Sequence, residues 1–221
     1  MKIAVIAAMS KEMKLIIPLL DKHSTVTVND ITYHCGSIAG HEVVAVQSGI
    51  GKVNAALSTL TLVDTFHPSI VINTGVAGGV GRANVLDVVI PSGIGYHDVW
   101  CGPDTVPGQA HGCPRLFDCP LPAELVAELG AKTGILASGD IFISRPEEVE
   151  HILSVYPEAV AVDMESAAIA HTCYLKGVPF VAIRVVSDTP GAEDNIAQYG
   201  DFWSAAPERT FATLTHLIER L

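Results

Sequence analysis

Short apolar segments alternate with longer, helix-like segments along most of the chain. Residues 2–8 and 180–186 are rich in Val and Ile, and each is too short to be a buried helix of ordinary length. This alternation predicts an α/β fold, in which a mostly parallel sheet carries helices on both faces. A chain of 221 residues is long enough to bury a core, and we expect one domain over residues 1–221.

The same patterns predict the remaining elements. Strands are expected at 25–35 and 41–47 around a turn at Ala39-Gly40, and at 85–91, 133–138 and 158–162. Residues 69–73 should form a strand that ends in a glycine-rich turn, and residues 96–120 a long loop rich in Gly, Pro and Cys. Helices are expected from the segment SGIGKVNAA to about residue 66, at 121–130, 146–153 and 164–176, and finally near 202–220.

The charge balance excludes some classes of partner. The formal net charge is −11 and no basic cluster offsets it, so neither a nucleic acid nor an anionic membrane surface is an expected partner. No apolar run approaches the roughly 20 residues of a membrane helix. Lys11, Glu12 and Lys14 interrupt the first apolar segment, unlike a signal peptide. We therefore expect a cytoplasmic protein.

The cysteines and histidines do not form a metal-binding pattern. The five cysteines are odd in number and irregularly spaced, and the nine histidines include no HExxH pair. We expect reduced, structural cysteines, no metal ion and no cofactor.

Two glycine-rich segments resemble phosphate-binding motifs only superficially. In SGIGKV, Val46 stands where a P-loop requires glycine, and Val53 stands where it requires Ser or Thr. Neither this segment nor NTGVAGG contains GxGxxG, so dinucleotide binding is not expected. The glycines of NTGVAGG would let a ligand approach the backbone closely, or would simply form a tight turn.

Acidic residues are placed at or near the ends of several predicted strands. Glu12 follows the first strand, Asp163 and Glu165 follow another in the segment VDMES, and Asp188 ends a third. Alternation along that third strand places Arg184, Val186 and Asp188 on one side. Each acid alone could equally be a structural residue in the first turn of a helix or in a loop turn. Together, at the carboxyl ends of sheet strands, they suit glycosidic bond cleavage, which needs a proton donor, a base and an anion beside a cationic sugar.

Motifs along nearly the whole chain resemble those of one family. The segments are AAMSKEM, SGIGKVNAA, VINTGVAGG, YHD, GCP, SGDIFI, VDMESAAIAH, VPFVAIRVVSD and FWSAA. In this order they resemble the 5′-methylthioadenosine/S-adenosylhomocysteine nucleosidases of the nucleoside phosphorylase superfamily. The resemblance implies a three-layer α/β/α fold with a twisted mixed sheet, a homodimer, and hydrolysis of an adenine nucleoside with a place in methionine salvage.

The resemblance also implies roles for the charged residues. Glu12 would be the base that activates water, with Arg184 nearby. Glu165 would accept hydrogen bonds from the ribose hydroxyls and stabilise the cationic sugar. Asp188 would donate a proton to purine N7, which requires a carboxyl that is protonated near neutral pH, as burial promotes. Asp163 would then serve structure as a helix cap.

Seven further residues would bind the substrate. Ser187 would accompany Asp188, Met164 would pack beside the ribose, and Ile50 would line the 5′ side. The purine would be held by four residues: Ala77, Gly78, Phe142 and Ile143.

Two departures from the family pattern leave the substrate open. Val76 replaces the serine of the common NTGSAGG, and the 96–120 loop, with Trp100 and His111, differs from the common version. A futalosine-type nucleosidase is therefore an alternative. A phosphorylase would need a phosphate site with arginines, whereas AAMSKEM supplies an acid. A nucleoside sensor without turnover is the third possibility, which the retained acids argue against.

Overall fold

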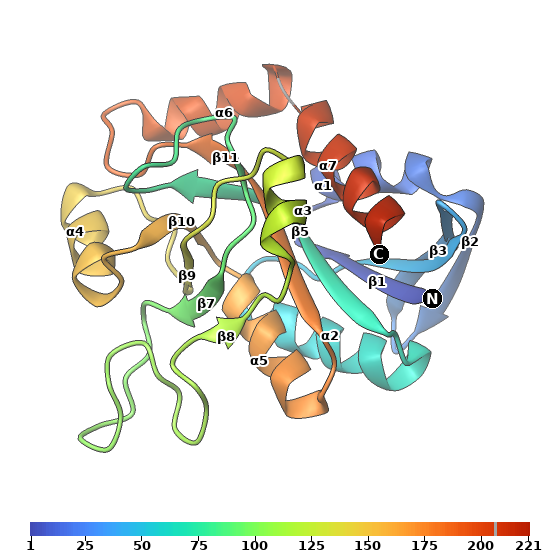
Figure 1. The fold of residues 1–221 in the computed structure, drawn as a ribbon, viewed down its shortest axis with the longest axis horizontal. Coiled ribbons are helices and arrows are strands. Elements are labelled where there is room, and N and C mark those ends of the chain that lie inside the picture. The colour runs from blue at the N-terminus through green and yellow to red at the C-terminus, as the bar shows by residue number, and fades with distance from the viewer. Residues whose placement is uncertain (206) are drawn as a thin grey trace.

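The computed structural model describes the backbone of residues 1–205 and 207–221, and the side chains of all residues outside 205–211. Among the described residues, eleven strands form one mixed sheet, with helices on both of its faces (Figure 1). The strands are β1 (Lys2–Ala7), β2 (Asp21–Val28), β3 (Ile31–Ile38), β4 (His41–Gln47), β5 (Ile70–Gly79), β6 (Val88–Val89), β7 (Gly93–Tyr96), β8 (Phe117–Asp118), β9 (Ile135–Ser138), β10 (Ala159–Asp163) and β11 (Phe180–Asp188). The helices are α1 (Ser10–Ile16), η1 (Ile17–Leu19), α2 (Lys52–Phe66), α3 (Ala123–Glu128), α4 (Pro146–Val155), α5 (Ser166–Lys176), α6 (Asn195–Ala205) and α7 (Pro207–Arg220).

The strand order confirms the three-layer architecture. The sheet runs β2-β3-β4-β1-β5-β10-β9-β7-β8, and β11 also pairs with β5. β4, β1, β5 and β11 are parallel, as are β10, β9 and β7, whereas β10 meets β5 antiparallel. In Figure 1, α2 and α5 cover one face of the sheet, and α1, α6 and α7 cover the other. Carboxyl ends from both parallel groups thus approach one another near the middle of the sheet.

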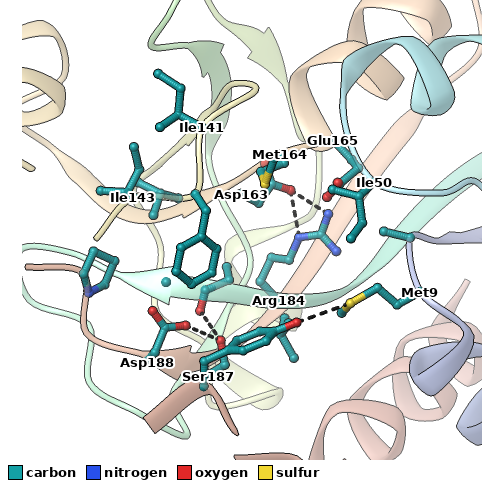
Figure 2. Close-up of a pocket in the computed structure, with 18 of the residues that line it drawn as sticks. Met9, Ile50, Ile141, Ile143, Asp163, Met164, Glu165, Arg184, Ser187 and Asp188 are labelled. Atoms are coloured by element: carbon teal, nitrogen blue, oxygen red, sulfur yellow. Dashed lines mark hydrogen bonds and ion pairs between the residues drawn. The ribbon is translucent and has the colours of Figure 1, made fainter. Parts of the chain in front are cut away.

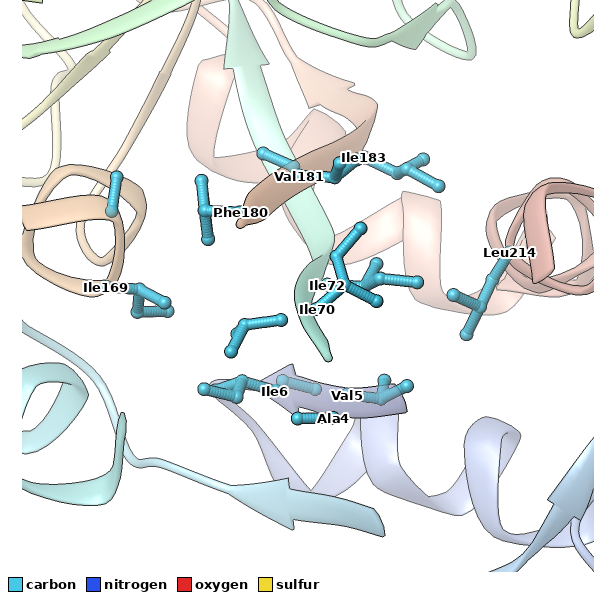
Figure 3. Packing of buried hydrophobic residues seen from close by; sticks show 14 of the residues in the cluster. Ala4, Val5, Ile6, Ile70, Ile72, Ile169, Phe180, Val181, Ile183 and Leu214 are labelled. Atoms are coloured by element: carbon cyan, nitrogen blue, oxygen red, sulfur yellow. The ribbon is translucent and has the colours of Figure 1, made fainter. Parts of the chain in front are cut away.

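The core lies around the central strands. Ile6 of β1, Ile72 of β5 and Ile183 of β11 are fully buried side chains in this cluster (Figure 3). Ile169 of α5 and Leu214 of α7 also belong to it, and Figure 3 shows them on opposite sides of the strands. β-branched side chains fit such pleated surfaces, which explains why the apolar segments became strands.

Two sequence predictions about strands are wrong. Residues 25–35 are not one strand but a hairpin, because Asn29 and Asp30 adopt positive φ angles of 49° and 61°, which these residue types tolerate in a tight turn. The glycine-rich segment after residue 73 is not a turn, because β5 continues to Gly79 and pairs there with β10. A Cβ atom at Gly78 would lie 2.5 Å from Pro190 Cγ, so close packing explains this glycine.

The other element predictions are largely confirmed. The turn at Ala39-Gly40 has positive φ angles at both residues. The strand predicted at 85–91 is shorter, and the 96–120 loop contains only the brief strand β8. The final helix predicted near 202–220 corresponds to α6, which begins earlier, and to α7; residue 206, which completes the segment FWSAA, lies outside the described residues.

Candidate active site

A pocket lies where β1, β5, β10 and β11 end, and polar side chains from these separate segments meet in it (Figure 2). All eleven residues predicted for the site line this pocket: Glu12, Ile50, Ala77, Gly78, Phe142, Ile143, Met164, Glu165, Arg184, Ser187 and Asp188. The roles assigned to them remain predictions. Six other residues that line the pocket were not predicted for the site: Ala8, Met9, Ile141, Val162, Pro190 and Tyr199.

Glu12 is buried and held by backbone groups. It lies in α1, just after β1, and its carboxylate accepts hydrogen bonds from Met9 N–H at 2.9 Å and Val76 N–H at 3.1 Å. A Cβ atom at Gly75 would lie 2.3 Å from Glu12 Oε1 and 2.8 Å from Arg184 Nη1, so glycine is required for these groups to meet. Burial raises the pKa of Glu12, although the charge of Arg184 and the backbone donors oppose the rise.

Arg184 is the cation of the pocket, and Asp163 neutralises it. Arg184 Nη2 lies 2.6 Å from Asp163 Oδ2, and both side chains are buried. Asp163 also accepts hydrogen bonds from the backbone N–H and the hydroxyl of Ser166 at the start of α5. Asp163 therefore satisfies a backbone donor in the first turn of α5, as a structural role requires, but the N-cap position itself is occupied by Glu165. Asn73 accepts a further hydrogen bond from Arg184, which completes a buried polar network.

Glu165 lies two residues from Asp163 but has a different environment. Its Oε1 accepts one hydrogen bond, from Gly51 N–H at 2.9 Å. Burial, reinforced by the charge of Asp163, raises the pKa of Glu165 to about 7, against the opposing effects of Arg184 and the Gly51 N–H. A carboxyl with this pKa and few protein partners can bind a ligand.

Asp188 lies on the opposite side of the pocket in Figure 2, with Arg184 drawn between it and Glu165. Its Oδ1 accepts a hydrogen bond from the hydroxyl of Ser187 at 2.5 Å, and its Oδ2 accepts one from the side-chain amide of Asn195. Burial raises the pKa of Asp188, although both donors oppose the rise. This carboxyl is thus disposed to hold a proton at a higher pH than an exposed aspartic acid.

The predicted alternation along β11 is wrong at Val186. The register with β5 shifts between Val186 and Asp188, which is a bulge. Ser187 consequently lines the pocket beside Asp188, whereas Val186 Cγ1 would lie only 2.6 Å from a Cβ atom at Gly79. A bulge of this kind leaves no period-2 signal in the sequence, and so alternation alone could not locate it.

Apolar side chains complete the wall beside Asp188. Phe142 and Tyr199 contact edge to face, with ring centroids 5.7 Å apart and an angle of 76° between the planes. The hydroxyl of Tyr199 donates to Met9 Sδ at 3.3 Å (Figure 2). Tyr199 and Asn195 come from α6, which follows β11 after an irregular turn, and no motif or spacing in the sequence marked either residue.

The arrangement suits acid–base chemistry on a flat, uncharged ligand. It offers three buried carboxyl groups with raised pKa values, on Glu12, Glu165 and Asp188, beside an aromatic wall. Among the residues that the structure describes, no cluster of three or more His, Cys, Asp or Glu side chains could bind a metal ion, and no helix is long and apolar enough to cross a membrane.

A family model and individual relatives of known name both match nearly the whole chain. A family model described as the phosphorylase superfamily matches residues 2–219. The chain is 39% identical, over an alignment of 233 positions, to the 5′-methylthioadenosine/S-adenosylhomocysteine nucleosidase of Lysinibacillus sphaericus, and the match covers 100% of both chains.

Solved structures show the same similarity. The S-adenosylhomocysteine nucleosidase of Streptococcus pyogenes, in complex with 5-methylthiotubericidin, has a TM-score of 0.93 and 34% identity, covering 100% of this chain and 97% of that one. The nucleosidase of Colwellia psychrerythraea, in complex with adenine, has a TM-score of 0.93 and 33% identity, covering 100% and 96%.

Proposed function

Because the chain belongs to the phosphorylase superfamily and, within it, to the 5′-methylthioadenosine/S-adenosylhomocysteine nucleosidases, we propose that it hydrolyses an adenine nucleoside such as 5′-methylthioadenosine or S-adenosylhomocysteine. Water replaces the base at C1′, and adenine is released. The observation that carries this proposal is the convergence of Glu12, Glu165 and Asp188 on one pocket from three separate segments.

The proposed roles follow from the surroundings of each acid. Asp188 donates a proton to purine N7 as the C1′–N9 bond breaks, so that the bonding electron pair leaves with a neutral base. Glu12, whose backbone donors and neighbouring Arg184 favour its charged form, takes a proton from the attacking water. Glu165 accepts hydrogen bonds from the ribose hydroxyls, and its charge stabilises the oxocarbenium ion.

The remaining lining residues orient the substrate. Phe142 packs on the adenine, and Ile143 meets its edge. Met164 lies beside the ribose, and Ile50 borders the 5′ group. Ala77 and Gly78 form the floor beneath the purine, and Ser187 holds the acid. This assignment needs no cofactor or metal ion, so we expect EDTA to leave the activity unchanged.

Hydrolysis is favoured over phosphorolysis by the charges at the sugar end. Arg184 is the one cation among the described residues that line the pocket, and Asp163 already pairs with it. Glu12 would also repel a phosphate anion from the position of the nucleophile. Adenine release should therefore proceed in phosphate-free buffer. Strict dependence on phosphate would support a phosphorylase, and binding without any turnover would support a nucleoside sensor.

The 5′ substituent defines the substrate, and its side of the pocket is apolar. Met9, Ile50 and Val76 lie in the lining, and half of the Ile50 side chain is exposed. We propose a small thioether group as the preferred occupant. A panel of adenine nucleosides that differ only at the 5′ position, with released base quantified, tests this. Preference for a nucleoside of the futalosine type would assign the other substrate class.

An exposed apolar face supports a homodimer, which we propose as the active form. Val53, Leu57 and Leu60 recur along one side of α2, with Val53 69% exposed and Leu57 58% exposed, and Tyr174 and Leu175 of α5 are also exposed. Light scattering of the purified protein should give twice the mass of one chain, and the Leu57→Glu variant should give the mass of a single chain.

We also propose that the enzyme acts in the cytoplasm, in methionine salvage. Its five cysteines are free thiols, as expected in a reducing compartment.

A further inference from the structure

Acidic residues from three neighbouring strand ends meet the start of α2. β10, β9 and β7 lie side by side and parallel, and Glu165, Asp140 and Asp98 follow them in that order. Gly51 N–H donates to Glu165 at 2.9 Å. Lys52 N–H donates to Asp140 Oδ1 at 2.8 Å, and Lys52 Nζ donates to Asp98 Oδ2 at 2.7 Å. The first N–H groups of this helix are thus satisfied by acids from distant segments, which the positive end of the helix dipole also favours.

Further contacts tie the two outer acids together and to the turn before α2. Asp140 N–H donates to Asp98 Oδ2 at 2.9 Å, so one carboxylate oxygen receives both Asp140 and Lys52. Gly51 has a φ angle of 93°, and a Cβ atom there would lie 3.0 Å from Asp140 Oδ1. The position of the Gly51 N–H is therefore fixed by close contacts with residues that do not themselves line the pocket.

The orientation of Glu165 depends on this N–H. In the part of the chain that the structure describes, Gly51 N–H is the one hydrogen-bond donor to the Glu165 carboxyl group, and it occupies Oε1. Oε2 is left for a ligand. A shift of the first turn of α2 would therefore turn or release the carboxyl group that faces the sugar.

We propose that Asp98 and Asp140 are positioning residues for nucleoside binding and hydrolysis. They hold Lys52, and through it the Gly51 N–H, so that Glu165 presents Oε2 to the ribose hydroxyls. The inference rests on the proposed function, in which Glu165 binds the sugar.

The test compares Asp140→Ala with Asp140→Asn, which keeps an oxygen that can accept from Lys52 N–H. Asp140→Ala should lower kcat/KM for adenine release by about tenfold, as expected for a displaced substrate-binding group. In the pH profile of kcat/KM, the low-pH limb should also move to higher pH, because loss of the hydrogen bond from Gly51 N–H raises the pKa of Glu165 further. Asp140→Asn should retain the wild-type profile. Asp21→Ala, at the far edge of the sheet, is the matched control and should change nothing.

A second measurement isolates the path through Glu165. The substrate 3′-deoxyadenosine lacks one hydroxyl that Glu165 would bind. The fold-loss in kcat/KM caused by Asp140→Ala should therefore be smaller with 3′-deoxyadenosine than with adenosine. The inference would be overturned if Asp140→Ala lowered kcat/KM equally for adenosine and 3′-deoxyadenosine. It would also be overturned if Asp140→Ala and Asp140→Asn lowered kcat/KM equally at every pH. Lys52→Met replaces Asp140→Ala if thermal unfolding shows that the latter is misfolded. If the wild-type protein released no adenine, the proposed function would fail, and nucleoside binding by the same variants, measured by calorimetry, would still test the positioning.

Discussion

At the sugar end of the pocket, Glu12 accepts hydrogen bonds from two backbone N–H groups, whereas at the base end Asp188 accepts them from the side chains of Ser187 and Asn195. Backbone donors cannot rotate away, so they hold Glu12 in place and favour its ionised form. A hydroxyl donor such as that of Ser187 can turn and accept instead, so Asp188 can gain and lose a proton without losing its neighbour.

The charges near the two acids also favour an ionised Glu12 more than an ionised Asp188. The charge of Arg184 opposes the rise in the pKa of Glu12, whereas only neutral side chains oppose the rise at Asp188. The comparison explains how two buried carboxyl groups in one pocket can take opposite roles. The sugar end suits a base that must be ionised, and the base end suits an acid that must be protonated.

The largest effect is expected from removing the proton donor at the base end. Asp188→Asn should lower kcat by about 10³-fold, within the range typical of general acids, because the adenine must then leave without a proton on N7. Adenine binding, measured by calorimetry, should persist because the amide has the same shape. The control is Asp201→Asn, an exposed aspartate of α6, which should retain full activity. Unchanged turnover in Asp188→Asn would remove the leaving-group role.

A smaller but still large effect is expected at the sugar end. Glu12→Gln should lower kcat by about 10²-fold, because water can still attack an oxocarbenium ion without full deprotonation. In the wild-type enzyme, activity should fall as the pH drops through the raised pKa values of Glu12 and Glu165, since both carboxyl groups at the sugar end must be ionised. Initial rates across pH should show this low-pH limb altered in the variant, with Lys14→Gln, exposed on the same helix, as the control. Normal rates in Glu12→Gln would contradict its role as the base.

The next prediction separates the two ends by pH. Activity should be lost as the pH rises through the raised pKa of Asp188, because the acid must keep its proton. Asn195→Leu removes a donor that favours the ionised form, so the pKa of Asp188 should rise further and the high-pH limb should move to higher pH. The maximal rate should fall about tenfold because the carboxyl loses its orientation.

The low-pH limb, set at the other end of the pocket, provides the internal control for Asn195→Leu and should stay in place. A shift of both limbs together, or of neither, would contradict the separate control of the two acids. The pH profile of kcat/KM, measured for wild type and variant in the same buffers, decides between these outcomes.

The sugar end could be predicted from the sequence better than the base end. Alternating apolar segments placed Glu12 and Glu165, and also Asp188 of the base end, near strand ends, and the parallel arrangement of strands brings such ends together. The motif VDMES indicated that one acid would be structural, and Asp163 is indeed paired with Arg184.

The partners at the base end depend on features without a local signal. The bulge that places Ser187 in the pocket comes from the register between β11 and β5. Tyr199 reaches the pocket and Asn195 reaches Asp188 because α6 packs back against β11 after an irregular turn, which is a tertiary contact. The hairpin at Asn29-Asp30 could have been found from its turn residues, whereas the continuation of β5 through its glycines could not, because pairing with β10 decides it.

The smallest effect is expected where the two ends touch. Tyr199 donates to Met9 Sδ at 3.3 Å, and the N–H of the same methionine holds Glu12. Tyr199→Phe removes this hydrogen bond but keeps the edge-to-face contact with Phe142, and because a thioether is a weak acceptor, kcat/KM should fall only about twofold. Tyr199→Leu, which also removes the ring, should raise KM several-fold above its value in Tyr199→Phe. A tenfold loss in Tyr199→Phe, with the low-pH limb displaced, would instead mean that α6 positions Glu12 through Met9, and the two ends would then not act independently.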